Sequence, residues 1–197
     1  MHALQSIVLL GLPMVIVGSP VVEKRTPTSP FGLYAYGDGI GGAAIFTTGD
    51  GAFIGNASQV NNSQAAPAQF EVDTDNSLLA NPNTTASDSS PTWSNLTFYV
   101  PDNTTSSHQV EFTNSTSGVN KSVSAFVFYG QFLLHKTTSG DLQTLWYALP
   151  TDTDGVWSLN WNSTGDDTEG QVVVSLTSTA PSTGSADADT ADADTSQ

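Results

Sequence analysis

The stretch VWSLNWNST, residues 156–164, indicates the fold class because its side chains alternate along the chain. Asn162 begins a glycosylation sequon, and a glycosylated asparagine has to face solvent. Successive side chains of a β-strand point to opposite faces, so residues in phase with Asn162 are expected outward and the others inward. The expected core residues are Trp157, Leu159 and Trp161, and the expected outward ones are Val156, Ser158 and Asn160.

The stretch WSNLTFYV, residues 93–100, has the same construction. Asn95 begins another sequon and is expected to face solvent. The alternation then places Leu96, Phe98 and Val100 in the core.

The rest of the chain extends this all-β pattern, since clusters of Gly, Asn, Asp and Ser separate short apolar runs. The run SVSAFVFYG, residues 122–130, is apolar on both faces, which predicts a central strand covered on both sides. The predicted fold is an all-β single domain, a β-sandwich or jelly roll, with a β-trefoil or a closed barrel as alternatives. The predicted strands span residues 32–36, 43–47, 52–55, 69–73, 95–100, 109–113, 122–129, 132–136, 142–148, 156–161 and 171–176.

Two glycine-containing stretches predict connections between strands. The pair Asp50-Gly51 predicts a tight hairpin between strands 43–47 and 52–55. The run YGDGIGGAAIF, residues 36–46, has neither a phosphate-loop pattern nor a following helix, so we expect a long turn there.

Both ends of the chain are expected to lie outside the folded domain. The apolar run Ala3–Val17 is too short and too interrupted to span a membrane and is typical of a signal peptide. The pair Lys24-Arg25, flanked by prolines, resembles a kexin-type processing site. The last 18 residues contain no apolar side chain larger than alanine, which predicts a disordered tail without a membrane anchor. The predicted organisation is a signal peptide (1–18), a propeptide (19–25), a linker (26–30), an all-β domain (31–179) and an acidic tail (180–197).

The composition excludes several classes of protein. The formal net charge is −15, with only four Lys and Arg residues, so no basic surface is available for nucleic acid or anionic lipid. The chain has no cysteine, which excludes a disulfide scaffold, a thiol nucleophile and a cysteine-based zinc site. Secretion stays compatible with this composition, because a domain of this size can bury a sufficient core without disulfides.

Glycosylation sequons of the form Asn-x-Ser/Thr support secretion independently of the first residues. Any sequon that is used has to lie on the surface, because the glycan is bulky and polar. The eight predicted sites are Asn56, Asn61, Asn83, Asn95, Asn103, Asn114, Asn120 and Asn162.

Catalytic residues do not form a recognisable set in the sequence. Glu71 and Glu111 lie in predicted strands and are the candidate carboxylate pair of a glycosidase-like enzyme. Both alternate with apolar neighbours, as ordinary outward strand residues do. His108 and His135 lack metal-ligand spacing, and the chain has no G-x-S-x-G motif, so no catalytic residue, metal or cofactor is assigned.

Carbohydrate binding is the alternative to an enzyme. Trp146 and Tyr147 in LWYALP, residues 145–150, are the candidate carbohydrate contacts, because aromatic rings stack on sugars. Neighbouring strand residues point to opposite faces, so only one of the two is expected outward.

The opening FGLYAYGDGIGG…GDGAFIG and the closing LWYALPTDTDGVWSLNW…VVVSLTSTAPS resemble a group of poorly characterised fungal secreted glycoproteins. More distantly, the layout is similar to fungal cell-wall proteins of the phialide and appressorium type, which generally carry cysteines. The resemblance implies a location outside the cell or in the wall and supplies no catalytic residues. We therefore expect a secreted, N-glycosylated, non-enzymatic protein whose partner is a cell-wall polysaccharide or an extracellular protein.

Overall fold

The computed structural model of the chain describes residues 26–85, 89–102, 104–115, 121–122, 125–165 and 167–182. The predicted signal peptide, the pair Lys24-Arg25 and most of the predicted acidic tail lie outside these residues. The described residues form antiparallel β-strands and one 3-10 turn, η1 (Ala57–Gln59), which confirms the all-β prediction.

The strands are short and differ in their burial patterns. In chain order they are β1 (Phe31–Gly32), β2 (Tyr34–Gly37), β3 (Ile40–Thr47), β4 (Ala52–Gly55), β5 (Ala66–Val72), β6 (Leu78–Pro82), β7 (Leu96–Pro101), β8 (Glu111–Thr113), β9 (Lys121–Ser122), β10 (Phe126–Tyr129), β11 (Phe132–Lys136), β12 (Leu142–Gln143), β13 (Trp146–Pro150), β14 (Val156–Trp161) and β15 (Val172–Thr177).

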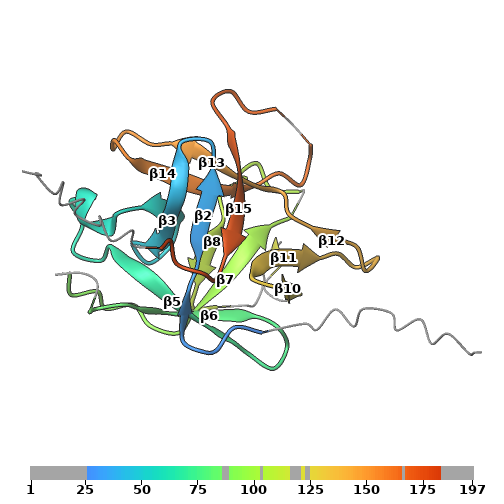
Figure 1. The fold of residues 1–197 in the computed structure, drawn as a ribbon, viewed down its shortest axis with the longest axis horizontal. Coiled ribbons are helices and arrows are strands. Elements are labelled where there is room, and N and C mark those ends of the chain that lie inside the picture. Colours follow the sequence, from blue (N-terminus) through green and yellow to red (C-terminus); the bar gives the residue numbers. More distant parts are fainter. Residues whose placement is uncertain are drawn as a thin grey trace, which may run out of the picture.

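Six of these strands close into a ring in the order β2-β3-β4-β14-β13-β15 (Figure 1). Every neighbouring pair is antiparallel. The ring closes where β15 pairs with β2, in a register that places Tyr34 opposite Thr177 and Val174 opposite Gly37. The closed barrel, one of the alternatives left open by the sequence, therefore describes the centre of the domain.

A second set of strands continues the sheet from β3 through β5, β6 and β7 to β8. The segment that leads into β8 returns to the barrel, because Gly51 bridges to Glu111 and Gln109 bridges to Asn160. The amide of Val110 also donates to the carbonyl of Leu159 at 2.9 Å. Residues 108–112 thus cover one side of the barrel next to β14.

A third group, β10, β11 and β12, projects from the barrel as a hairpin with a short extra strand (Figure 1). It joins the barrel where Phe132 pairs with Thr177 of β15. Its inner face contributes Phe126, Phe128 and Leu133 to the core, and each of these is at most 3% exposed.

One apolar core fills the barrel and extends beneath the other strands. Leu96, Phe98 and Val100 are all buried, which confirms the orientation predicted for residues 93–100. Trp146 and Trp161 pack edge to face with ring centroids 4.5 Å apart. Such contacts stabilise a core beyond the area that they bury.

The orientation predicted for residues 156–161 is only partly right. Leu159 and Trp161 lie in the core, but Val156 and Asn160, which were expected outward, are 3% and 4% exposed. Val156 packs with Phe46 and Ala57 in a second small apolar cluster under η1. Asn160 lies beneath the segment that bridges to it and donates to the Ser158 carbonyl at 3.0 Å. The outer face of β14 is therefore covered by other parts of the chain.

The glycine-rich run 36–46 is a hairpin and not the long turn that the sequence predicted. Gly37 pairs with Ile40, so Asp38 and Gly39 alone form the connection between β2 and β3. Gly39, the second residue of this connection, has a φ of 70°, a left-handed conformation that glycine adopts without steric cost. The hairpin predicted at Asp50-Gly51 is confirmed, since β3 and β4 pair on either side of it.

Candidate functional site

The predicted carbohydrate contacts, Trp146 and Tyr147, are both buried, at 1% and 3% exposure. The indole Nε1 of Trp146 donates to the Leu133 carbonyl at 3.1 Å. On the other face of β13, the Tyr147 hydroxyl lies 3.1 Å from Nδ1 of His108, in the segment that covers the barrel. The prediction that one ring faces outward is wrong because that face is also covered. Neither ring can stack on a sugar at the surface.

Glu71 and Glu111 point to the same face of one sheet but lie on β5 and β8, with β6 and β7 between them. Three strand spacings of about 4.8 Å separate them laterally by roughly 14 Å, and the register places Glu71 in line with Thr113, two residues from Glu111. The two carboxylates are therefore further apart than the roughly 5 to 9.5 Å of glycosidase pairs. Glu111 instead accepts a hydrogen bond from the Tyr99 hydroxyl. Burial, together with this bond, raises the pKa of Tyr99, which keeps the hydroxyl protonated.

The sequons within the described residues have accessible asparagines. In two of them, Asn56 and Asn83, Oδ1 accepts hydrogen bonds from the amide and hydroxyl of the residue two positions later. In this geometry Oδ1 accepts both hydrogen bonds, and Nδ2, the atom to which an N-glycan is attached, takes no part in them. Exposed asparagines are Asn56, Asn61, Asn95 and Asn114, half-buried ones are Asn83 and Asn162, and Asn103 and Asn120 lie outside the described residues.

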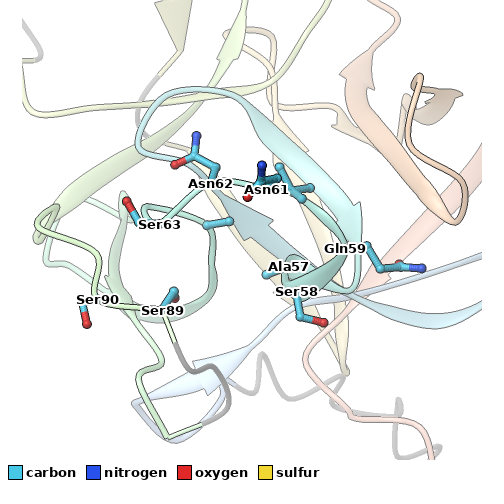
Figure 2. Close-up of a pocket in the computed structure, with 10 residues that line it drawn as sticks. Ala57, Ser58, Gln59, Asn61, Asn62, Ser63, Ser89 and Ser90 are labelled. Carbon is cyan, nitrogen blue, oxygen red and sulfur yellow. The ribbon is translucent and has the colours of Figure 1, made fainter.

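A hollow of 580 Å³ opens beside η1. Figure 2 shows it between the loop that carries Asn61 and Asn62 and the segment that carries Ser89 and Ser90. Its lining consists of small, hydroxyl and amide side chains and contains no charge. Asn61, the first residue of a predicted sequon, is among the residues that line it.

A serine and a histidine meet at the base of the β10–β11 hairpin. Ser122 Oγ lies 2.7 Å from His135 Nε2, and the His135 ring packs edge-on against Phe126 and Trp161. Burial lowers the pKa of His135, which favours the neutral imidazole. A serine nucleophile also needs a group that orients the histidine and donors for an oxyanion. Within the described residues the structure shows no carboxylate hydrogen-bonded to His135.

This histidine predicts a pH dependence of stability. Its pKa is lower in the folded protein than the value near 6.5 of an unfolded chain, so the unfolded state binds the proton first. We expect the contribution of His135 to be complete above about pH 6.5 and to decline as the pH falls toward the folded pKa. Urea unfolding between pH 7.5 and 5 measures it, and His135→Gln removes it. An identical pH profile for the wild type and His135→Gln would contradict this assignment.

The outer face of the β10–β11–β12 group is an exposed apolar surface, which we call the hairpin face. Tyr129 and Phe132 are directly opposite each other at its tip and are 54% and 50% exposed. Leu142, at the other end, is 45% exposed. The hairpin face consists of Ala125, Val127, Tyr129, Phe132, Leu134, Lys136 and Leu142.

A hollow of 540 Å³ opens at the end of the hairpin face opposite the aromatic pair. The polar residues that line this hollow are Asp75, Asn76 and Lys136. The remaining lining residues are Ala125, Val127, Gly140 and Leu142. The Asp75 carboxylate accepts from the Ser77 amide at 2.9 Å, and hydrogen bonds from Ser77 lower the pKa of Asp75. An ionised carboxylate and an ammonium group thus stand beside an apolar strip, the composition of many ligand sites.

The sequence contained the signal for this surface, but its interpretation was wrong. Residues 122–130 were expected in a central strand because both faces are apolar. In the structure β10 is the last strand in the order of the sheet, and only its inner face packs on the core. The apolar side chains of the other face are therefore left partly or largely exposed.

Comparisons with known proteins do not identify the chain. No protein-family model matches it, and neither the curated proteins nor the solved structures include a significant match. Among the described residues, no helix has the length and apolar character to cross a membrane.

Proposed function

We propose that this chain is a secreted, N-glycosylated, non-enzymatic protein of the extracellular space or the fungal cell wall, where it acts by binding a partner. The hairpin face is the observation that carries this proposal. Soluble proteins rarely expose contiguous large apolar side chains without a function for them. Tyr129, Phe132 and Leu142 are exposed on one face of one three-stranded unit.

Two further observations support the location and the absence of catalysis. All six sequon asparagines within the described residues are exposed or half-buried, so each has room for a glycan. The candidate carboxylates Glu71 and Glu111 are held on separate strands, and Glu111 is engaged by Tyr99. A binding role needs no assembled catalytic set.

Glycan mapping tests the proposed location. We expect a eukaryotic host to secrete the protein with glycans at Asn56, Asn61, Asn95 and Asn114, because their side chains are exposed. Enzymatic deglycosylation in heavy-oxygen water converts each used asparagine to a labelled aspartate, which peptide mass spectrometry detects. Asn61→Gln is the control and should lose only its own labelled peptide. Retention inside the cell, or secretion without any labelled site, would contradict the proposal.

A further inference from the structure

We propose that the hairpin face binds a neutral, β-linked polysaccharide. The sugar rings lie on Tyr129 and Phe132, and the hydroxyl groups reach the hollow that Asp75, Asn76 and Lys136 line. The inference rests on the binding role proposed above and names the class of ligand.

The aromatic pair has the geometry of a stacking platform. Tyr129 and Phe132 are directly opposite each other across the hairpin, so their Cβ atoms are about 4.5–5.5 Å apart. Only Gly130 and Gln131 connect the two strands, and Gly130 has a φ of 61°. An aromatic ring carries negative charge on its face, which attracts the C–H groups on the apolar face of a sugar ring.

The apolar strip continues from the aromatic pair toward the hollow. Val127 and Leu134 are opposite each other in the next outward position, and Lys136 follows on β11. The four steps along the strand from Phe132 to Lys136, at about 3.4 Å each, give a strip of roughly 14 Å. A strip on a sheet face suits a flat ligand. Equatorial β-1,4 linkages keep successive sugar rings in one extended ribbon, so such a chain can lie along it.

The charges of the hairpin face favour a neutral ligand. The whole chain carries a net charge of −15, which repels anionic polymers and a second copy of the chain. The hairpin face and its hollow contribute one cation, Lys136, and one anion, Asp75. Sugar hydroxyls both donate and accept hydrogen bonds, so they can be paired with a carboxylate and an ammonium group at once.

Retention on insoluble polysaccharides tests the inference. We expect the full secreted protein, with and without its own glycans, to sediment with at least one of β-glucan, cellulose, xylan and chitin. Tyr129→Ala and Phe132→Ala should each weaken this binding about tenfold or more, because central aromatic contacts dominate binding energy. Val173→Ala is the matched control, since Val173 is 72% exposed on β15 and lies outside the hairpin face. It should bind like the wild type.

Leucine variants separate ring stacking from general apolar contact. The double variant Tyr129→Leu with Phe132→Leu keeps an apolar surface but removes both rings, and we expect it to lose binding. Undiminished binding by this variant would overturn the inference. So would a dimer in sedimentation velocity that Tyr129→Ala abolishes, because the hairpin face would then be a self-association surface. Lack of retention on all four polymers would also overturn the polysaccharide inference. The proposed extracellular location would not be affected by that result, because glycan mapping tests it separately.

Discussion

Replacing Trp146 by alanine is expected to lower the free energy of unfolding by about 3–5 kcal/mol, the usual cost of deleting a buried tryptophan. Trp146 is 1% exposed and packs against Trp161 and Phe98. Its indole also satisfies the Leu133 carbonyl of β11, which the truncation would leave without this donor. Domains are stable by only about 5–15 kcal/mol, so this variant approaches the limit of folding. Urea unfolding followed by circular dichroism measures the effect.

Two other aromatic positions serve as controls for Trp146. Trp157 is half-buried at the margin of the core, so Trp157→Ala is expected to cost less. Tyr129→Ala removes an exposed ring and is expected to change stability by no more than about 0.5 kcal/mol. If Trp146→Ala kept full stability and instead lost polysaccharide binding, the burial of Trp146 and the position of the binding surface would both be contradicted.

Replacing Gly55 by alanine is expected to destabilise the protein by about 3 kcal/mol or more. Gly55 ends β4 with a φ of 135°, a conformation that L-residues rarely adopt. A Cβ atom there would lie 2.5 Å from the Gly155 carbonyl oxygen, on the turn that leads into β14. The β4–β14 contact is one of the seams of the barrel, so a local shift disturbs the closed ring. For a chain of this length, the expected fall in Tm is about 6–12 °C.

Gly41→Ala is the matched control within the neighbouring strand. Gly41 is exposed on β3, and a Cβ atom there would meet nothing within 4 Å. We expect a change within about 0.5 kcal/mol, because the substitution also reduces the freedom of the unfolded chain. Equal losses of Tm in Gly41→Ala and Gly55→Ala would contradict this explanation. The general effect of replacing a strand glycine by alanine, and not the contact between a Cβ atom at Gly55 and the Gly155 carbonyl, would then determine the loss of stability.

Local alternation was sufficient to predict many strands. The bounds of β4, β11 and β14 were predicted to the residue, and Leu96, Phe98 and Val100 face the core as expected. These elements depend on side chains that are close in sequence. Strand β6 was missed because LLANP is short and ends at a proline between turn residues.

Coverage of the outer faces could not be predicted from local patterns. Tyr147 and Asn160 are buried because the segment around His108 returns across β14, and no nearby residue signals that return. For the same reason the sequence pointed to Trp146 and Tyr147 as carbohydrate contacts, although both are buried. Trp146 and Tyr129 are both aromatic residues in apolar strands, and only the long-range closure of the barrel buries one and leaves the other exposed. The hairpin itself had a local signal in FYGQF, residues 128–132, because a two-residue connection that contains glycine between apolar runs is typical of a β-hairpin.

The pairing of β2 with β15, which closes the barrel, determines when the nascent chain can complete its fold. β2 is made early in translation, but its partner β15 follows every other described strand. A polypeptide that terminates prematurely before Val172 therefore keeps the edges of β2 and β13 open, and open edges are templates for aggregation. The five sequons from Asn56 to Asn103 precede β15 by many residues. If the chain is glycosylated as proposed, glycans added there during translation would keep the open intermediate soluble until β15 pairs with β2.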